Sequence, residues 1–474
     1  MTKPLREYQA SAIDALTRAV ENGRKRVILR APTGAGKTRI AREIVDRCVT
    51  HGAGAVFVAP RNEIIEQTSA ELTSAGIKHV VLQANHPEDY PVKVASTATL
   101  ARREVQSPAV LFLDEAHLWL DVAKKLIERF PESIVIGLTA TPERLDGRGL
   151  GEIYEEIIGV TETRDLIALK YLVPARVFGP ASPNMDGVRT TAGDFNRGDL
   201  ATLMDKPKIV GDIVGTWKKL ADGRSTIVYA AGVEASIHLR DAFRAAGIHT
   251  EHVDAETPAA EREDVVGRLR DGSLPVVCNV ELFTYGLDVP RVSCVSMARP
   301  TKSLALYLQM AGRGLRPFPD KDNLIILDHA GNALRHGLPD LVHEWKLGGA
   351  KVRKREVGSL RTCKRCFAIF APTLEKCPEC GLVVEKKLRQ VDHVDGELLE
   401  LQPVVQKTAK WAGLSDDARI RAFAKWLRTK SEGQAYAIYY NCFGQRPTPF
   451  ISKQAHRLNE YEATSIAIPI GGRG

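Results

Sequence analysis

The chain between residues 25 and 160 alternates short apolar runs with longer stretches in which apolar positions recur at helical spacing. The predicted strands are RVILRAP, AVFVAP, VKVAST, AVLFLDEA and SIVIGLTAT, and the predicted helices span 37–49, 61–75 and 118–130. Short strands that alternate with amphipathic helices are typical of a parallel sheet with crossover helices. The pattern therefore predicts an α/β lobe.

The same alternation predicts a second lobe further along the chain. Residues 174–207 are rich in Gly, Pro and Asp without a clear period, and we interpret them as a connector or insertion. After them come the predicted strands STIVYAA, TEHVDAE, PVVCNV, RVSCVSMA and NLIILDHA, with helices over 233–246, 259–270 and 303–312. We therefore expect two tandem parallel-sheet lobes of similar size.

The C-terminal part has a different pattern. It begins with the basic segment KVRKREV and a cysteine segment, and continues with a predicted helix, DDARIRAFAKWLRTK, and an aromatic patch, YAIYYNCFG. Its aromatic side chains fit core packing better than base stacking, because they lie in apolar helical segments; they are Trp411, Trp426, Tyr436, Tyr439 and Tyr440. We expect four regions: lobes at 1–165 and 166–347, a small cysteine domain at 358–385 and a basic, mainly helical accessory region at 386–474.

Length and composition agree with several domains in one chain. The 474 residues exceed what one hydrophobic core organises, and 44% hydrophobic with 26% charged residues is ordinary for a soluble protein. The N-terminal segment MTKPLREYQA lacks the apolar run of a secretory signal, and no apolar stretch is long enough to span a bilayer. We therefore expect a cytoplasmic protein that makes no membrane contact.

The net charge of +8 is unevenly distributed. From Lys346 to the end there are 23 Lys and Arg against 13 Asp and Glu, a balance of +10, whereas the first 345 residues have 43 against 45, a balance of −2. A basic C-terminal part suits a polyanion such as nucleic acid. A surface that only keeps the protein soluble is the alternative.

The segment VILRAPTGAGKTRIAREIV places a glycine-rich loop between a β-branched strand and a helix. In this context, backbone N–H groups and the helix N-terminus bind phosphates. Lys37 is expected to reach the β and γ phosphates and the Thr38 hydroxyl to bind Mg²⁺. The loop residues predicted to contact the nucleotide are Thr33, Gly34, Ala35, Gly36, Lys37 and Thr38. The strict phosphate-loop pattern is not met, because Ala31 stands where its first glycine belongs.

Two adjacent carboxylates follow the apolar strand in AVLFLDEAH. Strand ends open onto the crevice where ligands bind in such sheets. Asp114 is therefore a candidate Mg²⁺ ligand, and Glu115 is a candidate base for the attacking water. A strand end with a solvated acidic pair is the alternative.

With these motifs the chain resembles the DEAH-type helicases of superfamily 2 over about residues 1–335. The resemblance implies RecA-like lobes, ATP and Mg²⁺ as cofactors, and hydrolysis of ATP. LREYQ resembles the adenine-binding element, with Gln9 on the base and Arg6 and Tyr8 nearby. VAPRNEIIEQ, VASTATL and LTATP resemble the elements that grip the nucleic-acid backbone and couple that grip to hydrolysis. The residues carried over for this role are Pro60, Arg61, Ser96, Thr97, Thr139 and Thr141.

The second lobe carries two further motifs of this family. FTYGLDVP implies that Gly286 and Asp288 approach the nucleotide and ribose, and QMAGRGLRP implies that Gln309, Arg313 and Arg316 act across the cleft. Charge that develops on the γ-phosphate needs cations, which the arginines supply when the lobes close. Closing and opening of the cleft would then turn hydrolysis into steps along a strand.

The long run from VCNVELFTYGLDVP to LIILDHAGN resembles the branch that includes restriction-enzyme motor subunits, XPB-type helicases, phage helicases and RadD-like proteins. This branch implies a monomeric DNA helicase or translocase that acts on duplex or branched DNA in replication, recombination or repair, with a bacterial or phage origin. An RNA helicase and a nucleic-acid-binding scaffold with a silent motor remain as alternatives.

Four of the eight cysteines form two Cys-x-x-Cys pairs in RTCKRCFAIFAPTLEKCPECG. Cys363, Cys366, Cys377 and Cys380 predict a structural Cys₄ zinc ribbon, because each pair can direct two thiolates at one ion. An iron–sulfur or redox role and unliganded thiols are the alternatives, whereas disulfides do not suit a cytosolic chain. Basic residues around the ribbon could bind phosphates, or the ribbon could dock on the motor or on a partner protein; they are Lys364, Arg365, Lys376, Lys386, Lys387 and Arg389.

Overall fold

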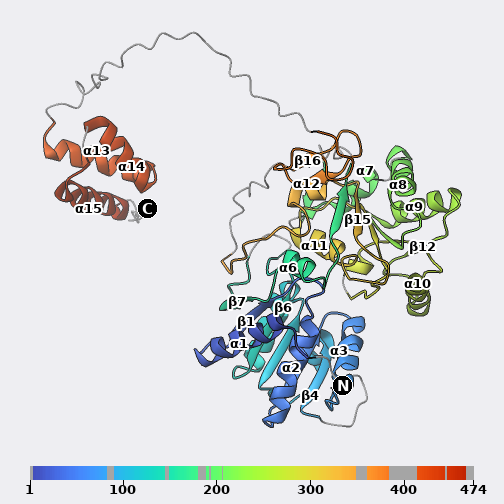
Figure 1. Ribbon diagram of the computed structural model, residues 1–474. Helices are drawn as coiled ribbons and strands as arrows, with labels where there is room; N and C mark the ends of the chain where they lie inside the picture. The colour runs from blue at the N-terminus through green and yellow to red at the C-terminus, as the bar shows by residue number, and fades with distance from the viewer. Residues whose placement is uncertain are drawn as a thin grey trace, which may run out of the picture. The chain divides into compact units, whose positions relative to one another are not determined.

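The computed structural model describes residues 4–82, 90–144, 149–179, 188–191, 194–204, 207–284, 286–348, 360–383, 414–443 and 446–465 (Figure 1). The chain divides into two compact units, residues 1–386 and 387–474. No described helix combines the length and the apolar character that a membrane crossing requires.

In the described part of the first lobe, seven parallel strands form a sheet in the order β3-β4-β2-β5-β6-β1-β7. They are β1 Arg26–Arg30, β2 Ala55–Ala59, β3 Val80–Val81, β4 Val92–Ser96, β5 Val110–Asp114, β6 Ile134–Thr139 and β7 Glu156–Gly159. The helices are α1 Glu7–Glu21, α2 Lys37–Thr50, α3 Asn62–Ser74, α4 Thr97–Arg102, η1 Ala116–Leu118, α5 Leu120–Arg129 and α6 Thr163–Ala168. Every residue of β2 and β5 is buried, which explains why these strands are continuous apolar runs: helices cover both faces of a parallel sheet.

The second lobe has a parallel sheet of six described strands in the order β12-β13-β11-β14-β15-β8 (Figure 1). They are β8 Ala175–Phe178, β11 Thr226–Ala230, β12 Thr250–Val253, β13 Val276–Asn279, β14 Cys294–Ala298 and β15 Leu324–Asp328. The helices are α7 Arg197–Met204, α8 Pro207–Leu220, α9 Val233–Ala245, α10 Ala259–Asp271, η2 Leu282–Thr284, α11 Leu304–Gly312 and α12 Asn332–His336, and β9 Thr190–Thr191 pairs with β10 Asp194–Phe195. The prediction of two tandem parallel-sheet lobes is confirmed.

The prediction of a connector over 174–207 is wrong for part of that segment, because it contains β8 and α7. Strand β8 has only four residues and directly follows Pro174. A proline in this position suits an edge strand, because the residue cannot donate to a ladder. Its carbonyl instead accepts a hydrogen bond from Leu324 N–H at 2.9 Å, which sets the start of the β8–β15 pairing.

Three helices make up the described part of the second unit: α13 Asp416–Thr429, α14 Glu432–Phe443 and α15 Pro449–Ser465. Ser415 caps α13 by accepting a hydrogen bond from Ala418 N–H. Phe423 and Tyr439 are fully buried, and Tyr436 and Trp426 pack against the same cluster. These contacts confirm the expected helix and core packing; Trp411 and the side chain of Tyr440 lie outside the described residues.

Candidate nucleotide site and metal centre

The phosphate loop connects the end of β1 to the start of α2. Gly34 and Gly36 have φ angles of +87° and +84°, which glycine adopts readily and other residues do not. A side chain at Gly36 would also meet Gln9, since an ideal Cβ lies 2.5 Å from Gln9 Nε2. Ala31, the departure from the phosphate-loop pattern, is buried and is not among the described residues with positive φ, so its Cβ fits here without backbone strain.

The predicted adenine-binding element packs directly on this loop. Gln9 is buried; its Nε2 donates to Ala35 O at 2.9 Å, and its Oε1 accepts from Arg6 N–H at 3.0 Å. Tyr8 OH also donates to Ala35 O, at 3.2 Å, and accepts from Arg6 Nη1 at 2.7 Å. In this conformation the polar atoms of Gln9 hold the loop, and recognition of a base by Gln9 stays a prediction.

The acidic pair lies at the end of β5, beside the loop. Asp114 and Glu115 are 8% and 7% exposed, yet among the described residues no hydrogen-bond partner exists for Asp114 Oδ1 or Glu115 Oε2. Burial and the neighbouring Glu115 carboxylate raise the pKa of Asp114 to about 7, against the lowering effect of Lys37 and Arg313. Buried carboxylate oxygens without partners are costly, so this site suits a cation that would bind them.

The backbone of the acidic pair is strained. Glu115 has a φ of +48°, a left-handed conformation that a residue with a side chain adopts at a cost of about 1–2 kcal/mol. Such strain collects at functional sites because the surrounding structure enforces it. Here the turn starts η1 immediately after β5 and leaves Glu115 Oε2 3.6 Å from His117 Nδ1.

His117 connects the acidic pair to the end of β6, a link that the sequence interpretation does not contain. Its Nδ1 lies 2.9 Å from Thr139 Oγ1, and Thr139 Oγ1 accepts from Thr141 N–H and donates to Thr141 O, both at 3.1 Å. Because the hydroxyl proton is used there, His117 donates from Nδ1. Burial lowers the pKa of His117, so the ring is neutral. Thr139 and Thr141 are fully buried here, and their contact with nucleic acid stays a prediction.

Two arginines of the second lobe have different environments. Arg313 is buried, and its guanidinium donates to Thr284 O at 2.8 and 3.1 Å and to Leu287 O at 2.9 Å. Its charge nevertheless lowers the pKa of Asp114, so it is near enough to act on the first-lobe site. Arg316 forms an ion pair with Asp288, whose side chain is 54% exposed.

The second lobe also approaches the first lobe at Gly312 and Gly286. An ideal Cβ on Gly312 would lie 2.8 Å from Thr33 of the phosphate loop, so α11 approaches the loop closely. Gln309 in the same helix is 2% exposed, and its amide oxygen and nitrogen find no partner among the described residues. Gly286 has a φ of +78°, and its carbonyl accepts a hydrogen bond from Gln67 of α3 at 2.7 Å.

The predicted strand-gripping residues gather at one sheet edge. Ala59 at the end of β2 pairs with Ser96 at the end of β4, so Pro60–Arg61 and Ser96–Thr97 emerge side by side. Ser96 Oγ accepts a hydrogen bond from Thr99 N–H and thereby caps α4. Arg61 Nη1 donates to Leu282 O of the second lobe at 2.9 Å. Relative movement of the lobes would therefore change the position of Arg61 at this edge.

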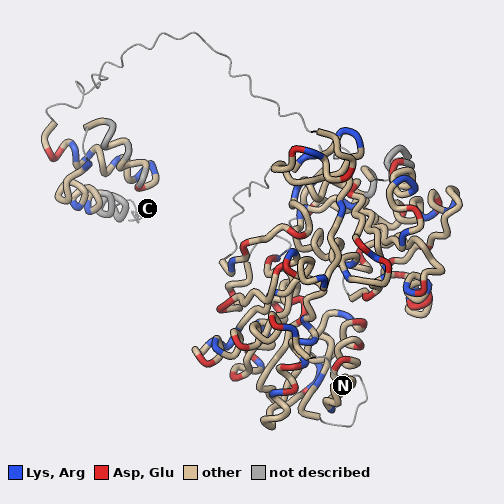
Figure 2. Tube along the Cα trace, in the orientation of Figure 1, with Lys and Arg blue, Asp and Glu red and all other residues tan. Residues whose placement is uncertain are grey.

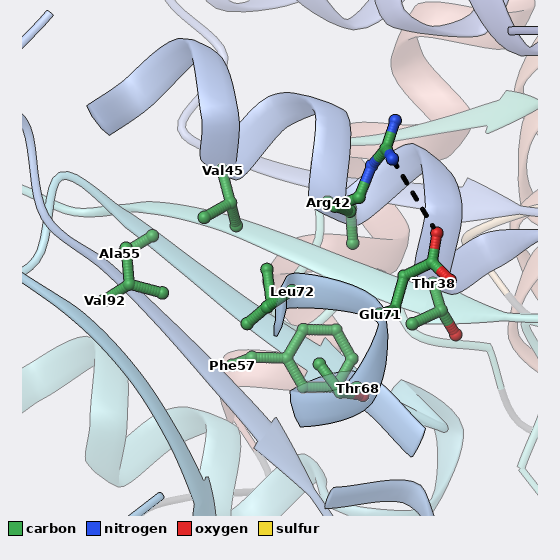
Figure 3. A pocket seen from close by; sticks show the side chains of 10 residues that line it. Thr38, Arg42, Val45, Ala55, Phe57, Thr68, Glu71, Leu72 and Val92 are labelled. Carbon is green, nitrogen blue, oxygen red and sulfur yellow. Dashed lines mark ion pairs between the residues drawn. The ribbon is translucent and has the colours of Figure 1, made fainter. Parts of the chain in front are cut away.

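A small cavity lies beneath the phosphate-binding helix, between α2, α3, β2 and β4 (Figure 3). Its wall includes Thr38 and Arg42 from α2 and Glu71 and Leu72 from α3. Arg42, only 8% exposed, pairs with Glu71 at 4.0 Å across this space. The packing ties the helix that starts at Lys37 to the helix that contacts Gly286.

The four clustered cysteines form a candidate metal centre. Their sulfur atoms lie within 4.8 Å of one another, with Cys363 Sγ 3.6 Å from Cys380 Sγ and Cys366 Sγ 3.6 Å from Cys377 Sγ. Four thiolates bound at about 2.3 Å around a tetrahedral ion stand about 3.8 Å apart. The donor set and spacing therefore fit a tetrahedral metal site.

The cysteine ribbon, residues 360–383, packs against the second sheet. Its strands β16 Arg361–Thr362 and β17 Ile369–Phe370 pair, and Ala368 bridges to Phe178 of the edge strand β8 (Figure 1). Gly179 N–H donates to Phe367 O at 3.0 Å, and Arg176 Nε contacts both Glu379 carboxylate oxygens at 3.0 and 2.9 Å. The ribbon therefore covers an otherwise open edge and docks on the lobe itself.

The site combines a phosphate-binding loop, carboxylate oxygens without partners and arginines from the second lobe. This combination suits a nucleoside triphosphate bound with a divalent cation. The fold and this site define a two-lobed P-loop ATPase. Residues 2–144 match the family model "Type III restriction enzyme, res subunit", and residues 205–317 match "Helicase conserved C-terminal domain".

Individual proteins are similar to this chain over most of its length. The chain is 31% identical to the 51.5 kDa protein of a Lactococcus phage, over 80% of this chain and 84% of that protein. It is 30% identical to the putative ATP-dependent helicase IRC3 of Saccharomyces cerevisiae, over 69% of this chain but only 51% of the yeast protein. A fragment of a putative HsdR subunit of a type I restriction enzyme from Vibrio vulnificus has the same fold, with a TM-score of 0.58 and 22% identity over 71% of this chain and 67% of that one. The chain belongs to the superfamily 2 helicases, in the branch that includes restriction-enzyme motor subunits and XPB-type helicases, and is an ATP-dependent helicase or translocase enzyme.

Proposed function

We propose that the chain is a DNA motor that hydrolyses ATP between its two lobes and uses the resulting movement to track along or separate DNA. The observation that carries this proposal is the pair of buried carboxylates beside Lys37, each with one oxygen that has no hydrogen-bond partner among the described residues, with Arg313 of the other lobe in electrostatic range. A bound cation would give these oxygens the partners that they lack and would suit the phosphates of a nucleotide.

Each side chain of the site has a proposed role. The loop from Thr33 to Thr38 and the start of α2 bind the phosphates, and Thr38 and Asp114 would hold Mg²⁺, which neutralises phosphate charge when bound. Glu115 orients the attacking water and accepts its proton. Arg313 and Arg316 stabilise the charge that develops on the γ-phosphate, for which Arg316 must leave Asp288.

Movement of the lobes is proposed to act on DNA through the edge formed by Pro60–Arg61 and Ser96–Thr97. Arg61 and Gln67 contact the second lobe beside this edge, so a change in lobe separation alters the edge directly. DNA is preferred over RNA because the matching family model describes a restriction-enzyme subunit, a class that acts on DNA. We propose a role in replication, recombination or repair, in a bacterium or phage.

The ribbon is proposed to bind zinc as a structural ion. Four thiolates form the donor set that zinc prefers, and the described ribbon has no room for a core of its own. Lys364, Arg365 and Lys376 are exposed on its loops, and the ribbon loops carry Lys and Arg in Figure 2. These side chains are proposed to contact DNA phosphates while the ribbon stays docked on the second lobe.

We further propose that the functional regions run over 1–165 and 166–347 for the two motor lobes, 358–385 for the ribbon and 386–474 for the accessory region. The protein is proposed to act as a monomer, and the accessory region or the ribbon would recruit a protein partner. Equilibrium sedimentation with and without DNA measures the molecular mass and so tests whether the protein is a monomer.

The proposal is tested by ATPase assays of the wild type with duplex DNA, single-stranded DNA and RNA side by side. Lys37→Ala and Glu115→Gln are expected to abolish DNA-stimulated turnover while the proteins stay folded. Lys124→Ala, an exposed lysine on α5, is the matched control and should keep wild-type turnover. DNA-stimulated ATP turnover retained in both site variants would refute the proposed mechanism. Stimulation of the wild type by RNA alone would favour an RNA helicase.

A further inference from the structure

The chain crosses from the first lobe to the second through Lys170–Pro174, and the backbone of this segment forms a tight turn. Lys170 has a φ of +59°, a conformation that residues with side chains seldom adopt. The N–H groups of Tyr171 and Leu172 both bond to Leu166 O, at 2.8 and 3.1 Å. The turn therefore fixes where the next two side chains lie.

Leu172 packs on the phosphate loop. It is 2% exposed, and its Cδ2 lies 2.7 Å from the position that a Cβ on Gly34 would occupy. Gly34 is thus required twice, by its φ of +87° and by the leucine against it. The loop that receives the phosphates cannot shift without displacing this side chain, because packed interiors have little free space.

Tyr171 contacts Arg6 and Tyr8 of the predicted adenine-binding element. The Arg6 guanidinium carbon lies 3.7 Å from the centroid of the Tyr171 ring, and the Tyr8 ring meets it edge-on at 6.1 Å. Tyr8 in turn bonds to Ala35 O of the phosphate loop. Two consecutive residues of the crossing therefore touch both parts of the nucleotide site.

The next residue bonds to the arginine-bearing segment. Val173 N–H donates to Leu315 O at 2.9 Å, and Leu315 is buried between Arg313 and Arg316 in sequence. The path from the phosphate loop to the arginines therefore consists of one packed contact and one backbone hydrogen bond on adjacent residues.

We propose that Tyr171, Leu172 and Val173 form a nucleotide-sensing hinge, with Leu172 as the positioning residue that sets the second-lobe arginines according to the state of the phosphate loop. This proposal rests on the proposed function. A bound triphosphate fixes the loop, the loop fixes Leu172, and Val173 transmits that position to Leu315. Small shifts at a packed contact become discrete lobe movements in this way.

The test compares Leu172→Ala with Leu172→Met in the full-length protein, with KM for ATP and kcat measured at saturating DNA. Truncation leaves the nucleotide-binding residues in place but frees the loop from the arginine segment. We expect kcat to fall about tenfold or more, since misplaced catalytic groups can cost up to about a hundredfold, while KM stays within about twofold. The methionine should restore at least half of kcat.

Controls separate positioning from folding. Leu169→Ala changes the leucine that directly precedes this segment and is 56% exposed, and it should leave both constants unchanged. Leu172→Val removes both Cδ atoms but keeps a branched side chain, and it replaces the alanine variant if that protein does not fold. Thermal unfolding gives the folded fraction, by which every kcat is corrected.

A corrected kcat equal to that of the wild type in folded Leu172→Ala or Leu172→Val would overturn the hinge, and so would a change confined to KM. Loss of turnover in Lys37→Ala together with an unaffected Leu172 variant would retain the ATPase and reject the hinge alone. Absence of DNA-stimulated turnover in the wild type would instead reject the proposed function.

Discussion

The apolar face of the ribbon gives a quantitative prediction through Phe370. This side chain is 3% exposed and belongs to one buried cluster with Phe178, Ile325 and Leu327 of the second sheet. Replacement of a buried phenylalanine by alanine costs about 3–5 kcal/mol, because the ring's transfer free energy is forfeited and a cavity is left behind. Phe370→Ala should therefore destabilise the second sheet by that amount.

The assay is thermal unfolding followed by circular dichroism, with metal release followed by a chromogenic chelator. For a cooperative unit of about 150–250 residues, each kcal/mol lowers Tm by about 2–4 °C, so the transition that includes the second sheet should fall by about 6–20 °C. Leu374→Ala is the matched control, because Leu374 lies on the same ribbon but is 43% exposed. Its effect should stay within about 0.5 kcal/mol.

The two signals separate the possible outcomes. If the ribbon is part of the second-lobe core, metal release and the main transition move to lower temperature together in Phe370→Ala. Early metal release with an unchanged main transition would show that the ribbon folds independently, and the docking contacts would then contribute little.

Three further predictions concern other parts of the chain. Without Mg²⁺, the raised pKa of Asp114 means that the folded protein binds more protons than the unfolded chain between about pH 4 and 7, so the free energy of unfolding should fall as pH rises through that window. The fall should be smaller in Asp114→Asn. Denaturant titrations at several pH values measure this slope, and a rise with pH that is specific to the wild type would contradict the prediction. Gly137→Ala should destabilise by about 1–3 kcal/mol, because its Cβ would lie 2.8 Å from the buried Tyr154 ring, and an unchanged Tm would contradict this. The double variant Lys364→Ala and Arg365→Ala should reduce the salt dependence of DNA binding by about 0.9 in log–log slope for each phosphate that the ribbon no longer neutralises, and an unchanged slope would limit the ribbon to docking.

Local patterns in the sequence predicted the sheets well. The strands are runs of β-branched and apolar residues buried on both faces, and the acidic pair directly follows such a run, so its place at the strand end needed no knowledge of distant contacts. Helix α5 and the η1 turn together occupy nearly the predicted range 118–130. Parallel pairing then brings the phosphate loop and Asp114 to one edge of the sheet.

Contacts set by the path of the chain could not be predicted in this way. Leu172 and Tyr171 lie in no motif, and only the crossing between the lobes brings them to Gly34 and Arg6. Strand β8 lies in a segment rich in Gly, Pro and Asp without a clear period, and its place in the sheet depends on pairing with the distant strand β15. The packing of the ribbon's apolar residues against the second sheet joins residues far apart in sequence, so no local pattern indicates it.

Arg313 and Arg316 belong to the same motif, but their different environments suit them to different roles. The three donor nitrogens of Arg313 are all bonded to backbone carbonyls inside its own lobe, and withdrawal of that guanidinium would leave buried acceptors unsatisfied at about 1–3 kcal/mol for each group. Asp288 is more than half exposed, and exposed ion pairs contribute only about 0–1 kcal/mol, so release of Arg316 costs little. Arg313 is thus suited to act from a fixed position through its charge, which already reaches Asp114, whereas Arg316 is the arginine that closure of the lobes can recruit.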